Sequence, residues 1–176
     1  QQVKADINTM DRAAGVMERR SQFARDINLV AMINEFGDGI IRELDYGGEL
    51  YNMRRLARNM ESIPGVNIPT AYPKLCTSKV LTMDYVEGVK INNVAAIDAA
   101  GLDRTAIGTT VLRALIKQLM IDGFFHADPH PGNVLVNLDT GIVTFLDMGL
   151  MGELSVADRF NLVYLLMLSR QIDPAG

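Results

Sequence analysis

The chain has 176 residues, of which 48% are hydrophobic and 22% are charged, a balance typical of one globular domain with a sizeable core. Its net charge of -4 and its scattered lysines and arginines argue against nucleic-acid binding. Cys76 is the only cysteine, which excludes a disulfide framework or a cysteine metal site and fits a reducing, cytoplasmic compartment.

No targeting or membrane-spanning segment is predicted. The longest apolar run, "LVYLLML", is far shorter than the roughly 18 residues that span a bilayer. The opening "QQVKADINTMDRAAG" lacks a signal-peptide pattern and starts in helix-like sequence without a methionine. We therefore expect the chain to be part of a longer protein.

The first third of the chain is predicted to be helical. Apolar residues recur at helical spacing from Met17 to Asn34, between charged residues. The segment "IIRELDYGGELYNMRRLARNM" continues this character, although Gly47 and Gly48 weaken it by about 1 kcal/mol each relative to alanine. We expect either close backbone packing at this pair or a helix that begins only after it.

The middle of the chain changes character twice. The stretch "SIPGVNIPTAYP" should end the helix and follow an extended path, and "KVLTMDYV" is typical of a strand. A core helix is then predicted from apolar residues at i, i+3, i+4, i+7 and i+8, namely Leu112, Leu115, Ile116, Leu119 and Met120.

The last third predicts a hairpin followed by a helix. "VLVNL" and "IVTFL" are two short apolar strands around the turn "DTG". Ser155 and Asp158 form a capping-box pattern that should start a final helix running through Arg170.

The stretch "FFHADPHPGNVLVNLDTGIVTFLDMG" carries the chemistry. Asn133 opens the first hairpin strand and Asp147 ends the second, so the two side chains should converge. Their oxygens are hard ligands suited to magnesium. Asp128, in the preceding loop, is then placed to orient an acceptor hydroxyl or a water. Each of these residues alone is typical of a turn, but the three together match the spacing of phosphoryl-transfer enzymes.

The two histidines of the chain flank Asp128. His126 is expected either to hold the backbone near Asp147 or to act as a base, and the first role is favoured. His130 is interpreted as a polar loop residue or a neighbour of a phosphate, because no third histidine exists to complete a zinc site.

The segments "GFFHADPHPGN" and "LDMG", with "ELDYGGEL" and "VLTMDYVEGVKI" before them, resemble the UbiB-type atypical protein-kinase-like family, also called the AarF or ABC1-kinase family. The resemblance covers nearly the whole chain. It implies an α+β, predominantly α, protein-kinase-like fold, with the C-terminal lobe and an adjoining αC-like helix but little of the N-terminal lobe. The chain would be one partial domain with a helical part over about 1–62, a strand and hinge over 63–91 and a catalytic lobe over 92–176.

The resemblance also implies a role for individual residues. Asp128 would be the catalytic-loop aspartate, and Asn133 and Asp147 the magnesium ligands. The acidic residues implied in the E-x-D motif and in the pair with the nucleotide-positioning lysine are Glu43, Asp45 and Glu49. The hinge, whose backbone would meet adenine, corresponds to Met83, Asp84, Tyr85 and Val86.

The sequence departs from the family pattern in two places. Phenylalanine of the D-F-G motif is replaced by Met148, a flexible apolar residue that can keep the packing role. No K-x-G-Q segment, alanine-rich nucleotide loop or V-A-V-K strand precedes Gln1, and Lys4 is interpreted as a solvated helix residue. We therefore expect this stretch alone to be inactive.

The implied function is that of an ATP-dependent atypical kinase or ATPase that uses magnesium and supports isoprenoid quinone or lipid metabolism. Implied partners are a nucleotide, an isoprenoid quinone precursor or membrane lipid surface, and quinone-biosynthesis proteins. The implied location is cytoplasmic, peripheral at the inner membrane. Two alternatives stay open, a small-molecule phosphotransferase of the aminoglycoside or choline kind and a nucleotide-gated pseudokinase or lipid-binding scaffold.

Overall fold

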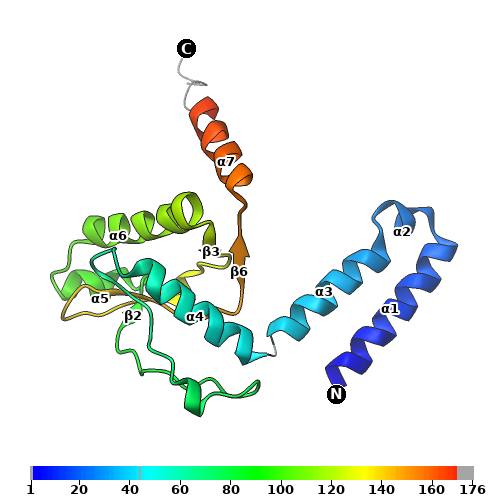
Figure 1. Cartoon of the computed structure of the whole chain (residues 1–176), viewed down its shortest axis with the longest axis horizontal. Coiled ribbons are helices and arrows are strands. Elements are labelled where there is room, and N and C mark those ends of the chain that lie inside the picture. Colours follow the sequence, from blue (N-terminus) through cyan, green and yellow to red (C-terminus); the bar gives the residue numbers. More distant parts are fainter. Residues whose placement is uncertain (1, 44, 170–176) are drawn as a thin grey trace.

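The computed structural model describes residues 2–43 and 45–169 (Figure 1). The first half contains α1 (Gln2–Arg20), α2 (Gln22–Asp26), α3 (Leu29–Glu43), α4 (Tyr46–Met60), β1 (Val66–Asn67), the 3₁₀-helix η1 (Pro73–Leu75) and β2 (Val89–Lys90). The second half contains α5 (Val94–Ala99), α6 (Arg104–Ile116), the π-helical turn η2 (Lys117–Asp122), β3 (Phe124–His126), the 3₁₀-helix η3 (Pro131–Asn133), β4 (Val134–Val136), β5 (Val143–Phe145), β6 (Met151–Glu153) and α7 (Val156–Ser169). The predicted mixed, mostly helical class is confirmed.

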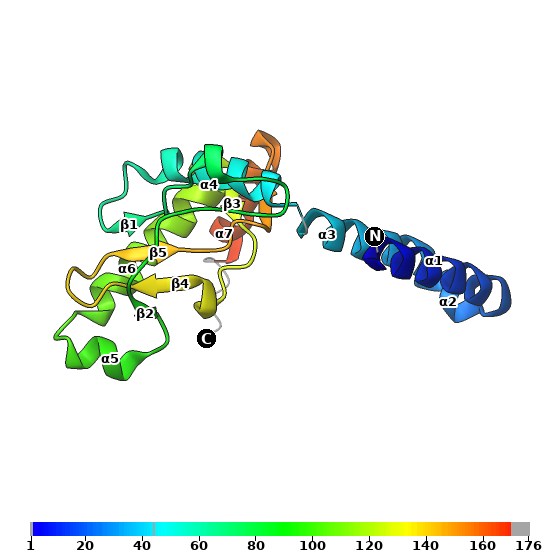
Figure 2. The same cartoon turned by 90° about the horizontal axis from the view of Figure 1, so that it is seen from below.

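The helices α1 to α3 form an arm that projects from the rest of the molecule (Figures 1 and 2). The first third is helical as predicted, but the stretch from Met17 to Asn34 is divided among α1, α2 and α3. Ser21 caps α2 by accepting the Ala24 N–H at 3.4 Å, and Asn28 takes a left-handed φ of 51° that turns the chain back. Asparagine tolerates this conformation better than most residues. Lys4 lies in α1, and its side chain is outside the described part.

The glycine pair lies in the first turn of α4. Asp45 caps this helix by accepting the Gly47 N–H at 3.0 Å, so the helix begins one residue before the pair and not after it. A Cβ atom on Gly47 would lie 3.0 Å from Oδ1 of Asp45, whereas one on Gly48 would meet open space. Gly47 therefore accommodates the capping carboxylate, and neither glycine lies against the backbone of another segment.

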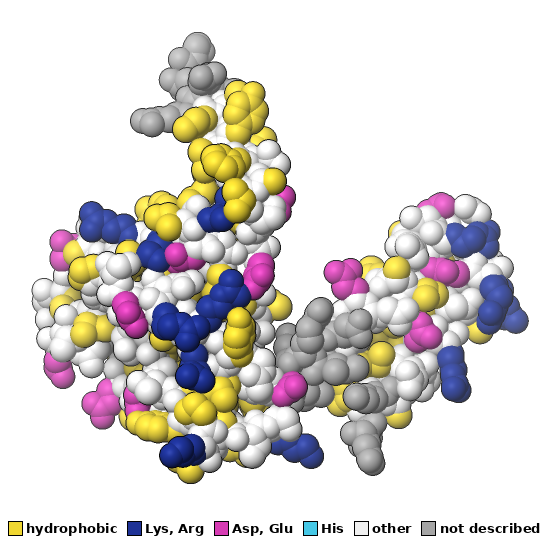
Figure 3. All heavy atoms as spheres, viewed as in Figure 1, with side chains coloured by type: hydrophobic (Ala, Val, Ile, Leu, Met, Phe, Trp, Pro, Cys, Tyr) yellow, Lys and Arg dark blue, Asp and Glu magenta, His cyan; other side chains and the backbone are white. Residues whose placement is uncertain are grey.

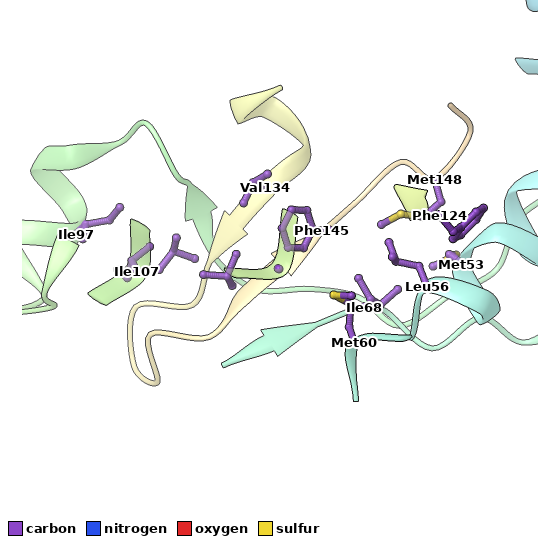
Figure 4. Packing of buried hydrophobic residues seen from close by; sticks show 13 residues of the cluster. Met53, Leu56, Met60, Ile68, Ile97, Ile107, Phe124, Val134, Phe145 and Met148 are labelled. Atoms are coloured by element: carbon purple, nitrogen blue, oxygen red, sulfur yellow. The ribbon is translucent and has the colours of Figure 1, made fainter. Parts of the chain in front are cut away.

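A small sheet in the order β1-β5-β4-β2 contacts α4 through β1 and α6 through β1 and β5. The predicted hairpin is confirmed as β4 and β5, which pair antiparallel with Val134 opposite Phe145. β1 joins parallel to β5 and β2 antiparallel to β4, while β3 and β6 form a separate pair. The buried core joins the sheet to both helices through Leu56, Met60, Ile107, Ala114, Val136, Val143 and Phe145 (Figure 4).

The segment "KVLTMDYV" is extended but does not form the predicted strand. It pairs only at two isolated bridges, Ala71 with Met83 and Thr77 with Val80. A regular strand needs a continuous row of partners along one edge, and the described residues do not provide one here.

The predicted apolar stripe on α6 and η2 meets the core only in part, because Leu115 packs against the core while other members are exposed. Leu112 is 57% exposed and Ile116 47% exposed, whereas Ile107, Ala114 and Gln118 are buried. These three residues follow a helical spacing on an adjacent face, where the small Ala114 allows close approach to the sheet. Gln118 already belongs to η2, the π-helical continuation of α6.

The predicted final helix is confirmed as α7. Ser155 Oγ accepts the Asp158 N–H at 3.1 Å, and Oδ2 of Asp158 accepts the Ser155 N–H at 3.2 Å, which completes the capping box. The predicted end at Arg170 lies outside the described residues. Hydrophobic side chains gather along α7 (Figure 3), and its exposed members include Phe160, Tyr164, Leu165 and Met167. No helix in the described part of the chain is long and apolar enough to cross a membrane.

Candidate active site

A cleft of ≈ 820 Å³ opens between the start of α4, the extended segment 79–83 and the loops that flank the hairpin. Its polar lining includes Glu49, Asp128, Asn133 and Asp147. The residues expected to form a metal and acceptor site are therefore brought together from positions up to 98 apart in the sequence.

The hairpin sets Asn133 and Asp147 at its open end. Asn133 ends η3, directly before β4, and its carbonyl oxygen accepts the Leu146 N–H at 2.7 Å. The Asn133 side chain donates to the Asp128 carbonyl oxygen at 3.4 Å. Asp147 follows with a left-handed φ of 58°, a conformation that costs a residue other than glycine roughly 1 kcal/mol and recurs at functional sites.

His126 links the Asp128 loop to the residue before Asp147. Its Nδ1 accepts the Asp128 N–H at 3.2 Å, so the ring hydrogen is on Nε2, which donates to the Leu146 carbonyl oxygen at 3.0 Å. The residue is buried, and both ring nitrogens are engaged. This geometry favours the holding role over the role of a base.

Glu49 reaches from α4 to the same loop. Its Oε1 accepts the Met148 N–H at 3.2 Å, while Asn52 Nδ2 donates to the Met148 carbonyl oxygen at 2.9 Å. Burial raises the pKa of the Glu49 carboxyl, and the nearby negative charge of Asp147 raises it further. The Met148 side chain is fully buried in the core, as expected for a residue that replaces phenylalanine.

Of the two E-x-D acids, the structure describes the side chain of Asp45 only. Glu43 ends α3, and its side chain lies outside the described part of the structure. Asp45 acts as the cap of α4 and is not part of the described cleft lining.

The four hinge residues divide between two surfaces. Met83 lines the cleft, whereas Asp84, Tyr85 and Val86 line a neighbouring groove of ≈ 560 Å³. Asp84 accepts hydrogen bonds from the Tyr72 hydroxyl and from the Thr70 N–H, and the Tyr72 bond lowers the pKa of Asp84 most. The side chain of Tyr85 is 89% exposed. Alternation along an extended segment explains why Met83 and Asp84 face opposite ways.

Sequence reasoning missed two residues. Lys79 lines the cleft and is the one positively charged residue among the described lining residues. Nothing in its local sequence indicates this position. Gln118 is fully buried, and its Oε1 accepts the His126 N–H at 2.9 Å. A polar residue within the apolar pattern "LIKQLM" was the available signal for Gln118.

The donor set suits a hard cation that completes its shell elsewhere. Among the described residues, no group of three His, Cys, Asp or Glu side chains is placed to hold a metal alone. Magnesium usually takes one or two protein carboxylates and the rest of its ligands from water and phosphate. Asp147 and Asn133 fit that pattern.

Comparisons with known proteins agree on one family. The family model of the ABC1 atypical kinase-like domain matches residues 1–174. An uncharacterized Synechocystis protein is 35% identical over 161 residues, covering 92% of this chain and 23% of the relative. The Arabidopsis thaliana protein ACTIVITY OF BC1 COMPLEX KINASE 8, chloroplastic, is 39% identical over 127 residues, covering 72% of this chain and 17% of the relative.

A solved structure shares the fold. The chain matches Rv3197 of Mycobacterium tuberculosis, solved in complex with erythromycin, with a TM-score of 0.61 and 27% identity. The match covers 86% of this chain and 37% of that one. The chain thus spans between about a sixth and two fifths of the proteins it matches.

Proposed function

Because this chain belongs to the ABC1 atypical kinase-like family, a family whose kinase-like fold implies nucleotide binding, we propose that the complete protein binds ATP with magnesium in the cleft and cleaves or transfers the γ-phosphoryl group. The observation that carries the proposal is the meeting of Asp128, Asn133 and Asp147 in one cleft, with Glu49 beside them. Phosphoryl transfer depends mainly on positioning and on charge neutralisation, which such a set supplies.

In this proposal Asp147 and Asn133 hold the metal. A bound magnesium ion would supply positive charge to the phosphate oxygens. The protein's own part is to keep the two ligand oxygens at the open end of the hairpin, which the Leu146 to Asn133 hydrogen bond does.

Asp128 orients the acceptor in this proposal. Its backbone N–H donates to Nδ1 of His126 and its carbonyl oxygen accepts from the Asn133 side chain. These two bonds fix the point from which the Asp128 carboxylate extends into the cleft. An aspartate in this place can accept the proton of a hydroxyl or direct a water. Glu49 would pair with a lysine, which we expect outside this stretch.

The proposal also covers the phosphoryl acceptor, the partner proteins and the cellular location. We expect an isoprenoid quinone precursor or a lipid at a membrane surface, with quinone-biosynthesis proteins as partners and a peripheral, cytoplasmic location. The apolar residues exposed along α7 are compatible with a docking surface of this kind. A small-molecule phosphotransferase is the second candidate, because the solved relative Rv3197 was complexed with the small molecule erythromycin.

A γ-labelled ATP experiment on the complete protein tests the proposal. Label should appear as free phosphate, or on a lipid or protein acceptor, in the presence of magnesium and not of EDTA. Labelled macrolide or aminoglycoside would support the second candidate. Nucleotide binding without any turnover, across these acceptors, would refute the enzymatic proposal and support a nucleotide-gated scaffold.

A further inference from the structure

The π-helical turn η2 places one buried side-chain amide, that of Gln118, against β3, directly before the Asp128 loop. Gly123 caps this turn with a left-handed φ of 61°, and its N–H donates to the Gln118 carbonyl oxygen. A Cβ atom on Gly123 would lie 2.7 Å from the Leu154 carbonyl oxygen, so glycine is required there. The side chain of Gln118 in this wide turn faces β3, where it bonds to His126, eight residues further along the chain.

The backbone N–H of His126 has the Gln118 side chain as its hydrogen-bond acceptor. In the antiparallel pair of β3 and β6, every second residue of the β3 segment directs its N–H and C=O groups towards β6. The Gly123 carbonyl oxygen and the Ala127 N–H both bond on that side, to the Leu154 N–H and the Leu150 carbonyl oxygen. The His126 N–H points to the opposite side, where Gln118 Oε1 accepts it at 2.9 Å. A buried donor without this acceptor would be left unsatisfied.

His126 in turn fixes two parts of the site. Its ring bonds to the Asp128 N–H and to the Leu146 carbonyl oxygen at 3.2 and 3.0 Å. A shift of the His126 backbone therefore moves the ring relative to both the Asp128 loop and the residue before Asp147. The same η2 turn is tied to α4, because Lys117 Nζ donates to the Asn59 carbonyl oxygen at 2.6 Å and forms an ion pair with Asp122.

We propose that Gln118 is a positioning residue, which sets the spacing between Asp128 and Asp147 through the backbone of His126. The effect on kcat that this inference predicts rests on the proposed phosphoryl-transfer function. Gln118 lies outside the cleft lining, and its side-chain hydrogen bonds in the described structure go to Met60 and His126, not to either aspartate.

The main variant is Gln118→Met in the complete protein, since methionine fills a similar volume but has no amide oxygen. Because a misplacement of about 1 Å can cost about 10²-fold, we expect kcat per bound nucleotide to fall about tenfold or more. The dissociation constant for nucleotide with magnesium should change less than about threefold. Normalising to bound nucleotide separates this effect from partial unfolding.

Two variants control the experiment. Met60→Leu removes the sulfur that the Gln118 amide nitrogen approaches at 3.9 Å, preserves an apolar side chain and should leave kcat unchanged. Gln118→Glu keeps an acceptor oxygen and should restore turnover towards that of the wild type. Equal losses in Gln118→Met and Met60→Leu would mean that core packing, and not the amide oxygen, matters.

A second measurement is independent of activity. Amide hydrogen exchange at His126 and Asp128 should become at least about tenfold faster in Gln118→Met than in Met60→Leu. Unchanged exchange, or unchanged kcat per bound nucleotide, overturns the proposal. If Gln118→Met does not fold, a folded Gln118→Glu with less than about a tenth of wild-type turnover overturns it as well. A wild-type protein without turnover refutes the proposed function alone, and the exchange measurement still decides the role of Gln118.

Discussion

Asp147→Asn separates the charge of this residue from its backbone conformation. Asp147 has a left-handed φ of 58°, a region that asparagine tolerates as well as aspartate does. The asparagine Oδ1 can still accept the Gly149 N–H, which Asp147 accepts at 3.3 Å. We therefore expect a melting temperature close to that of the wild type.

The loss of charge should weaken the proposed metal binding and change the pKa of Glu49. Substitutions behind a metal ligand already cost 10- to 100-fold in affinity, so loss of the charged ligand should weaken magnesium-dependent nucleotide binding by about 10²-fold or more, or about 2.7 kcal/mol. The pKa of Glu49 should fall, because the charge of Asp147 is the second cause of its elevation. It should stay above its ordinary value, because burial is the first cause.

Calorimetric titration of the complete protein with nucleotide, with magnesium and with EDTA, measures the first effect. Asp139→Asn, the same change at the exposed hairpin tip, is the matched control and should bind as the wild type does. In EDTA the two variants should not differ. Magnesium-dependent affinity that survives in Asp147→Asn would refute the metal assignment, and an unchanged Glu49 titration by NMR would refute the electrostatic argument.

Other predictions address the acceptor, the core, pH and the stretch by itself. Asp128→Asn should lower kcat by about 10²-fold or more with little change in nucleotide affinity, and loss of binding with preserved turnover would make Asp128 a metal or structural residue. Leu56→Ala should lower the free energy of unfolding by about 2–5 kcal/mol, and Leu112→Ala by less than about 1 kcal/mol, in chemical denaturation; equal losses would contradict the buried face described above. Because the pKa of Glu49 is raised in the folded state, its contribution to stability is fully present below the ordinary value of 4.5 and is lost as pH rises through the raised value. Glu49→Gln should therefore have a higher melting temperature than the wild type at pH 7 and no such advantage below pH 4.5. Residues 1–176 alone should bind a hydrophobic dye and release no phosphate from ATP, and magnesium-dependent release equal to that of the complete protein would show that the site needs nothing more.

Local patterns predicted the elements whose partners are close in sequence. The hairpin of β4 and β5 needs only two apolar runs and a turn, and both lie within 12 residues. The capping box at Ser155 is equally local. The break at Asn28 was not predicted, because its left-handed conformation matters only once α1 and α3 pack together. The strand at residues 79–86 failed for a related reason, since a strand is defined by a partner that the local sequence does not contain.

The same distinction applies to the site. Asn133 and Asp147 could be placed from the hairpin alone, and Glu49 was found only through the resemblance. Gln118 bonds to a residue in another element and Lys79 lines a cleft built from distant segments, so their local sequence carries no sign of these neighbours. The hinge was predicted as one unit, but alternation along the chain separates the Met83 side chain from those of Asp84 and Tyr85.

The backbone around Asp147 is held from two sides, and this explains how its left-handed conformation persists. Leu146 is fixed through its carbonyl oxygen by His126, and Met148 through its N–H and carbonyl oxygen by Glu49 and Asn52. Strained residues survive where their neighbours over-determine them. The proposed role of Asp147 as a metal ligand would require it to be held within about 0.5 Å of its working position, and these three bonds supply such a constraint from protein groups alone. Weakening any one of them should therefore affect magnesium binding before it affects the rest of the fold.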